Sequence, residues 1–123
     1  MLFLRILCTA LLLTAVIGRW AFAADLVMVE QEGCHWCAKW NMEISEIYPK
    51  TDEGRRAPLR RVDLRSLPND IAFTSPPVFT PTFVLVEDGK ELARIEGYAG
   101  DEFFWFLLNK MLDAHPNVAQ PQN

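Results

Sequence analysis

The chain has 123 residues, of which 50% are hydrophobic, so it can build one domain around one core, and a two-domain protein is excluded. Its formal net charge is −4 at pH 7, whereas a nucleic-acid-binding domain of this size would be basic. We therefore expect no nucleic-acid partner.

The first segment of the chain differs in composition from the rest. Arg5 precedes an apolar run from Ile6 to Ile17, and Ala21-Phe22-Ala23 places small residues on both sides of a larger one. This pattern predicts a secretory signal peptide, residues 1–23, that is cleaved after Ala23. A retained membrane anchor is less favoured, because the run is shorter than the about 20 residues of a spanning helix and Arg19 interrupts it.

Export decides how the cysteines are interpreted. Cleavage removes Cys8, Arg5 and Arg19 but no acidic residue, which leaves a mature chain of net charge −6 with Cys34 and Cys37. In an oxidising compartment a structural disulfide normally joins distant segments. So short a loop closes little chain entropy, and a redox function is the better interpretation of this pair.

The first half of the mature chain predicts a strand, a helix and a second strand. Leu26-Val27-Met28-Val29 is a short apolar run typical of a buried strand. Apolar residues then recur at helical spacing from Cys37 to Tyr48, and Pro49 is expected to end that helix. A loop rich in Gly, Arg and Pro leads to a second strand over residues 59–64, which should pair in parallel with the first.

The second half predicts a loop, a hairpin and a final helix. The proline-rich segment from Ser66 to Pro77 should be mostly loop, with at most a single turn around residues 69–73. Asp88-Gly89 suits the two-residue turn of an antiparallel hairpin between residues 82–86 and 91–95. The last helix should be capped by Asp101, and its apolar stripe is Phe104, Leu107, Leu108, Met111 and Leu112.

These elements give the order β-α-β-β-β-α with a mixed central sheet, an α/β fold. We expect the folded domain to span residues 24–115 and residues 116–123 to form a flexible tail.

The motif Cys34-His35-Trp36-Cys37 at the start of a helix meets the needs of thiol-disulfide exchange. The reaction requires an attacking thiolate and a second thiol that displaces the mixed disulfide. Free N–H groups and the helix dipole favour an anion at Cys34, which should lower its pKa from about 8.5. Cys37 lies one turn further in, on the apolar face, and is therefore the resolving thiol. His35, when protonated, can further stabilise the thiolate, although an exposed histidine without this function is the plainer alternative.

A zinc or copper site is the chemical alternative for such a cysteine pair. A structural zinc site needs four ligands, and only His35 and His115 remain as candidates in the mature chain. Exchange chemistry is therefore favoured, and no metal or diffusible cofactor is expected.

The mature chain resembles the thioredoxins in this motif, in Thr80-Pro81-Thr82 at the start of a strand, in Gly89 at the hairpin and in Gly97 after the next strand. The resemblance implies a cis proline at Pro81 that faces the cysteines. Thr80, Pro81 and Gly97 would then form a groove in which a substrate strand pairs.

Further segments resemble the SoxS-type thioredoxins, small periplasmic proteins that accompany bacterial sulfur-oxidation systems. These segments are residues 33–40, 48–55, 79–85, 96–98 and 103–105. The resemblance implies a periplasmic enzyme that reduces or isomerises a disulfide or mixed thiol adduct on a partner protein of sulfur oxidation. It also implies an upstream thiol-reducing donor in the membrane. After cleavage of the signal peptide we expect no stable membrane insertion of the mature protein.

The sequence departs from the thioredoxin pattern in two places. Many relatives carry a buried carboxylate six residues before the first cysteine, where it serves proton transfer, but here that position is Met28. Glu30, on the same strand face, is the nearest substitute, with a solvated strand end as the plainer alternative. The second departure is the loop at residues 66–77, where larger relatives have a helix, so we expect a trimmed thioredoxin fold.

Two further groups of residues allow more than one interpretation. The first group is five arginines close together in the sequence: Arg55, Arg56, Arg60, Arg61 and Arg65. They could steer an acidic partner protein, but the favoured interpretation is that they form the solvated face of a loop and a strand. Trp40 follows the core stripe, whereas Trp36 should be exposed beside the reactive sulfur. Trp105 and Phe106 form either a second packed face or a docking patch.

Two alternatives to a reductant remain open. The same fold could serve as a thiol oxidant or as a thiol carrier in cytochrome maturation. It could also be a binding module whose cysteines form a passive disulfide.

Overall fold

The computed structural model describes residues 24–118, so the predicted signal peptide lies outside the described residues. The elements in chain order are β1 (Ala24–Glu30), α1 (His35–Trp40), a π-helix (Asn41–Ser45), a 3₁₀ turn (Tyr48–Lys50), α2 (Asp52–Arg56), β2 (Leu59–Asp63), β3 (Thr82–Glu87), β4 (Lys90–Glu96) and α3 (Asp101–Asp113).

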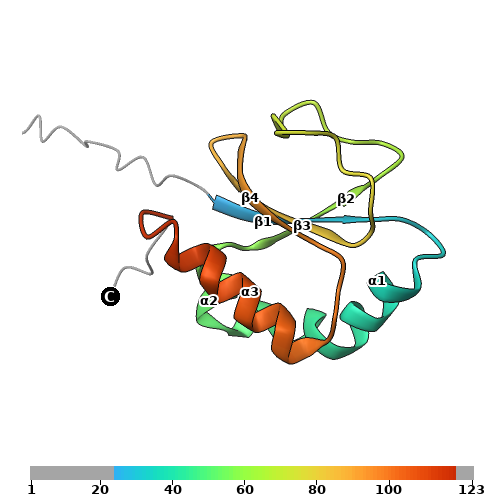
Figure 1. Ribbon diagram of the computed structural model, residues 1–123, viewed down its shortest axis with the longest axis horizontal. Helices are drawn as coiled ribbons and strands as arrows, with labels where there is room; N and C mark the ends of the chain where they lie inside the picture. The colour runs from blue at the N-terminus through green and yellow to red at the C-terminus, as the bar shows by residue number, and fades with distance from the viewer. Residues whose placement is uncertain (1–23, 119–123) are drawn as a thin grey trace, which may run out of the picture.

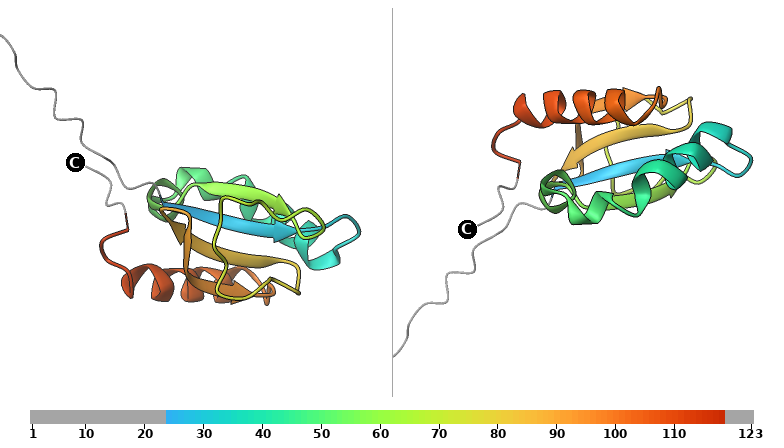
Figure 2. Two further views of the ribbon diagram at one scale, coloured as in Figure 1. Left: turned by 90° about the horizontal axis from the view of Figure 1, so that it is seen from above. Right: turned by 90° about the horizontal axis from the view of Figure 1, so that it is seen from below.

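The four strands of the described residues form one mixed sheet in the order β2-β1-β3-β4 (Figure 2). β1 pairs in parallel with β2 and antiparallel with β3, and β3 pairs antiparallel with β4. The predicted α/β class and mixed sheet are therefore confirmed. In the parallel pair Met28 lies opposite Arg61 and Glu30 opposite Asp63, a register that positions the site described below.

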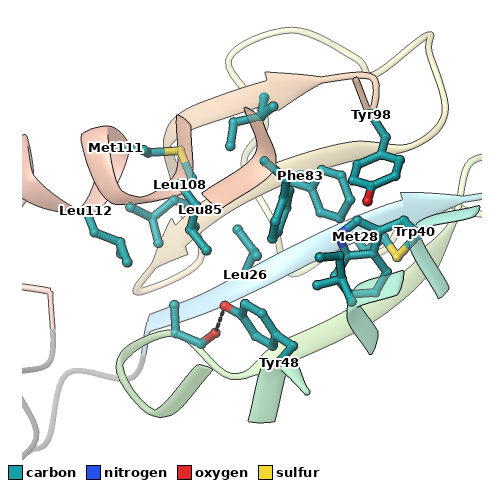
Figure 3. Packing of buried hydrophobic residues seen from close by; sticks show 14 of the residues in the cluster. Leu26, Met28, Trp40, Tyr48, Phe83, Leu85, Tyr98, Leu108, Met111 and Leu112 are labelled. Atoms are coloured by element: carbon teal, nitrogen blue, oxygen red, sulfur yellow. Dashed lines mark hydrogen bonds between the residues drawn. The ribbon is translucent and has the colours of Figure 1, made fainter. Parts of the chain in front are cut away.

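The two faces of the sheet are covered differently (Figures 1 and 2). All the helices pack on one face, where Leu26 and Met28 of β1 join the main core with Trp40, Phe83 and Leu108 (Figure 3). The opposite face buries a smaller cluster built around Val27, Val29, Ile71, Val84 and Val86. The loop at residues 64–73 covers that cluster, so the fold is trimmed as expected.

The Asp88-Gly89 hairpin forms as predicted. Both residues have positive φ, 52° and 74°, and Glu87 pairs with Lys90 across the turn. Gly89 takes this conformation without a steric cost, which is why the pair suits a two-residue hairpin.

The motif helix is less regular than expected. The α-helical part ends at Trp40 and continues as a π-helix to Ser45. Pro49 does not end the helix as predicted: it lies in the first turn of the 3₁₀ segment, where its missing N–H removes no hydrogen bond.

The loop predicted before the second strand contains the short helix α2. Thr51 caps it by accepting a hydrogen bond from the Gly54 N–H at 3.0 Å, and Asp52 and Glu53 occupy the first turn. The glycine content of the segment suggested a loop, but Gly54 serves close packing instead. A Cβ there would lie 1.9 Å from the Tyr48 carbonyl oxygen.

The loop over residues 66–77 forms no helical turn; Asn69 and Asp70 make an ordinary turn. Its middle is tied to the edge of β4, where the Ala72 N–H donates to the Gly89 carbonyl and the Glu91 N–H donates to Ala72. Glu91 accepts from the Thr74 N–H at 2.7 Å, and Arg94 donates to the Ser75 carbonyl at 2.5 Å.

The final helix has the predicted stripe, but its ends differ from the prediction. Gly100 is the N-cap and Asp101 is the first helical residue, where its carboxylate accepts from the Glu102 N–H. Val118, within the segment expected to form a flexible tail, is 1% exposed and belongs to the main core. Residues 119–123 lie outside the described residues.

Candidate active site

Cys34 and Cys37 form a disulfide at the start of the motif helix, with Cα atoms 5.2 Å apart. Cys34 is the N-cap of α1, and its Sγ accepts a hydrogen bond from the Cys37 N–H at 3.1 Å. Cys34 is partly exposed, whereas Cys37 is 4% exposed. A partner can thus reach the first sulfur much more readily than the second.

The two residues between the cysteines point outward. His35 and Trp36 are exposed and their rings meet edge to face, with centroids 5.0 Å apart. The Lys39 ammonium lies 5.4 Å from the centre of the Trp36 ring. This places one cation on the motif helix beside Trp36, which is exposed as predicted.

A groove of about 650 Å³ opens on one side of the disulfide. Its walls come from the end of β1, the motif helix and β2, and include Glu30, Cys34, Cys37, Asn41 and Arg61. Glu30, the last residue of β1, therefore lines the same groove as both cysteines.

Arg61 organises the polar side of this groove. It donates to Glu30 Oε2 at 2.6 Å and to Asn41 Oδ1 at 2.9 Å. Its guanidinium also lies over the Trp40 ring, 5.8 Å from the centroid, and next to the Met28 sulfur at 3.6 Å. Met28 thus fills the position of the usual carboxylate with an apolar side chain, and an arginine from β2 lies against it.

The other predicted groove residues meet at the carboxyl end of β4. The Thr80–Pro81 peptide is cis, as the resemblance implies, and the Pro81 carbonyl accepts from the Gly97 N–H at 2.7 Å. Thr80 Oγ1 accepts from Gln31 Nε2 at 3.0 Å, which ties the proline segment to the loop before the motif. Gly97 has φ of 85°, a conformation that favours glycine.

Exposed apolar side chains accompany both halves of the site. Trp36 is 49% exposed within the motif, and Val78 and Phe79, just before the cis-proline, are 66% and 59% exposed. Large apolar side chains left in solvent are typical of a surface that contacts another protein.

The remaining aromatic and basic residues divide between core and surface. Trp40 is buried as predicted, Trp105 stacks on Tyr48 with centroids 6.1 Å apart, and Phe106 is exposed. Trp105 therefore belongs to a packed face and Phe106 does not. Among the arginines, Arg60 pairs with Asp70 at 2.9 Å and Arg61 with Glu30, so their charges are compensated locally rather than gathered into a basic patch.

Within residues 24–118, no helix combines the length and the apolar composition that crossing a membrane requires. Within the same residues, no group of three or more His, Cys, Asp or Glu side chains is placed to hold a metal ion.

A mixed sheet, a helix that begins at a cysteine pair, and a cis-proline define a thioredoxin-fold thiol-disulfide oxidoreductase. A solved structure agrees with this class: the periplasmic thioredoxin SoxS from Paracoccus pantotrophus, in its reduced form, is 45% identical with a TM-score of 0.73. The match covers 75% of this chain and 98% of that one. The chain belongs to the SoxS-type thioredoxins. No protein-family model and no curated protein sequence matches it.

Several residues that frame this site are not predicted from the sequence. The sequence marks Arg61 only as one of a group of basic residues, and the signal for its contact is a cation on the strand that pairs with the strand of Glu30. Gln31, Asn41, Glu43 and Tyr98 carried no individual signal, because their partners are distant in sequence.

Proposed function

We propose that this protein is a periplasmic reductant or isomerase that acts on a disulfide or mixed thiol adduct of a partner protein. The observation that carries the proposal is the unequal access to the two sulfurs, with Cys34 reachable and Cys37 buried behind it. The exposed apolar residues around the motif and before Pro81 support a protein, rather than a small molecule, as the substrate.

The reaction proceeds in two exchanges. The Cys34 thiolate attacks one sulfur of the partner disulfide, forms a mixed disulfide and expels the other sulfur as a thiolate. Cys37 then loses its proton and attacks Cys34, which releases the second partner sulfur and leaves the Cys34–Cys37 disulfide. Two electrons pass to the partner, and an upstream thiol donor must return them.

We infer that Glu30 accepts the proton from Cys37. It lies in the groove that Cys37 lines, and the Arg61 guanidinium holds its carboxylate in place at 2.6 Å. Met28 at the usual carboxylate position leaves this function to another group. Thr80, Pro81 and Gly97 form the wall against which the partner strand pairs, and His35 stabilises the Cys34 thiolate when protonated.

We propose a periplasmic location for the mature protein. The Paracoccus protein is described as periplasmic, and the apolar segment at the start of this chain is consistent with export. From the resemblance of the sequence to the SoxS-type thioredoxins we further propose a partner in a sulfur-oxidation system and a membrane thiol reductase as the electron donor.

The direction of electron flow is tested by the equilibrium reduction potential of the mature protein, with alkylation to identify Cys34 and Cys37 as the titrating couple. We expect a value near that of thioredoxin, about −270 mV. A value near about −120 mV would assign the protein to disulfide formation, the oxidant alternative, and would overturn the reductant proposal.

A further inference from the structure

Three hydrogen bonds join the loop before the motif, the Thr80–Pro81 segment, the segment after β4 and the continuation of the motif helix into a closed ring. They are Gln31 Nε2 to Thr80 Oγ1 (3.0 Å), the Gly97 N–H to the Pro81 carbonyl (2.7 Å) and the Tyr98 O–H to Glu43 Oε2 (2.9 Å). Glu43 lies in the π-helix that continues α1, so the Tyr98 bond brings the ring back to the motif helix.

Tyr98 is held firmly enough to act as a fixed link. The residue is 6% exposed, and its ring meets Phe104 of the core edge to face with centroids 6.2 Å apart. Figure 3 shows the side chain extending from the segment after β4 toward Trp40 of the motif helix. Burial, reinforced by the hydrogen bond to Glu43, raises the pKa of the Tyr98 hydroxyl, so it remains a donor.

Glu43 extends the link to the exposed face of the motif. Its other carboxylate oxygen lies 3.8 Å from the Lys39 ammonium, and that ammonium lies over the Trp36 ring. Glu43 thus connects Tyr98 to Lys39 and Trp36 on the exposed face of the motif helix. Gly97 directly precedes Tyr98, and its N–H donates to the Pro81 carbonyl. A fixed Tyr98 therefore also holds Gly97 and Pro81 in place.

We propose that Tyr98 is a positioning residue that makes the enzyme selective for disulfides held in a polypeptide chain. A polypeptide must pass between the motif helix and the Pro81–Gly97 wall, so its reaction depends on the spacing that the Tyr98–Glu43 bond sets. A small disulfide needs only access to the Cys34 sulfur and does not contact both sides. The inference rests on the thiol-disulfide exchange itself and not on the identity of the partner.

Tyr98→Phe tests the proposal, because it removes the hydroxyl and keeps the ring. Single-turnover oxidation of the reduced protein is measured with insulin, a protein disulfide, and with hydroxyethyl disulfide, which has no peptide backbone. We expect the rate constant with insulin to fall about three- to tenfold, the scale of one ordinary intramolecular hydrogen bond. The rate with hydroxyethyl disulfide and the reduction potential should stay unchanged.

Tyr48→Phe is the matched control, since Tyr48 is also a buried tyrosine and donates to the Ala57 carbonyl at 2.6 Å, away from the groove. It should leave the ratio of the two rates as in the parent. Glu43→Gln keeps an acceptor oxygen and should retain most of the selectivity, whereas Glu43→Ala should lose it without adding to the effect of Tyr98→Phe. A parallel fall with both disulfides, or an equal change of the ratio in Tyr48→Phe, would overturn the proposal.

Discussion

The difference in exposure between Cys34 and Cys37 predicts opposite results for two serine substitutions. Cys34→Ser removes the reachable sulfur and should abolish disulfide reduction. Cys37→Ser keeps the attacking thiolate but loses the thiol that resolves the adduct, so a mixed disulfide with the partner should accumulate. Non-reducing electrophoresis and mass spectrometry of protein recovered from a periplasmic extract check both results. Activity in the Cys34→Ser protein would contradict the mechanism.

Glu30 is expected to act in the second exchange and not in the first. Glu30→Gln keeps the shape of the side chain but cannot accept the Cys37 proton, so release of the mixed disulfide should slow at least about tenfold near neutral pH. Rapid acid quenching separates the formation of the adduct from its release. Glu32→Gln, which lies in the same groove, is the control. Equal release rates in the parent and in Glu30→Gln would exclude the relay.

Gly54 controls the stability of α2 because the helix passes very close to the preceding turn. A Cβ at this residue would overlap the Tyr48 carbonyl, and backbone atoms there have little room to move. Gly54→Ala should lower the free energy of unfolding by about 1–3 kcal/mol, although alanine favours helices elsewhere. Urea unfolding measures the change, and Arg55→Ala, on the exposed side of the same helix, should have a much smaller effect. A more stable Gly54→Ala protein would contradict this packing.

The loop over residues 66–77 is held through Glu91, which gives its attachment a pH dependence. Burial opposes ionisation of this carboxylate, but hydrogen bonds from Arg94 and Thr74 outweigh it and hold the pKa of Glu91 below its ordinary value. The unfolded chain therefore takes up this proton first as the pH falls. The stabilisation is complete above about pH 4.3, the ordinary glutamate value, and is lost as the pH falls through the lower folded value.

Urea unfolding between pH 3 and pH 7 should accordingly show a steeper loss of stability in the parent than in Glu91→Gln. At neutral pH we expect Glu91→Gln to be about 1–3 kcal/mol less stable, because a hydrogen-bonded charge with a 3% exposed side chain is replaced. Exposed Glu46→Gln should keep the parent profile. An unchanged acid limb in Glu91→Gln would show that another group is responsible.

The whole domain extends further than its secondary structure. Val118 lies beyond the last helix yet packs in the main core. Val118→Ala should lower the free energy of unfolding by about 1–2 kcal/mol, the scale of the buried methyl groups it removes. Thermal unfolding measures this, with exposed Asn117→Ala as the control. If the two variants are equally stable, Val118 does not contribute to the core and the folded domain ends near His115.

Local patterns in the sequence were sufficient for most of the elements. The apolar run of β1, the Asp88-Gly89 turn and the stripe of α3 are short-range signals, and each appears where expected. The signals for α2 were also local: a threonine cap, two acidic residues in the first turn and two arginines in the last. The glycine in this segment nevertheless favours a loop. Gly54 is required by its close approach to the Tyr48 carbonyl, a contact that no local pattern shows.

By itself the sequence determined the class of chemistry, since two cysteines at the start of a predicted helix have few other uses in a protein with a predicted signal peptide. Only the tertiary structure decided which polar residues frame them. Glu30 meets Arg61, Gln31 meets Thr80 and Glu43 meets Tyr98 across separations of 31 to 55 residues. Local propensity carries no information about such pairs, because they form only when the sheet register and the packing of the helices bring their elements together.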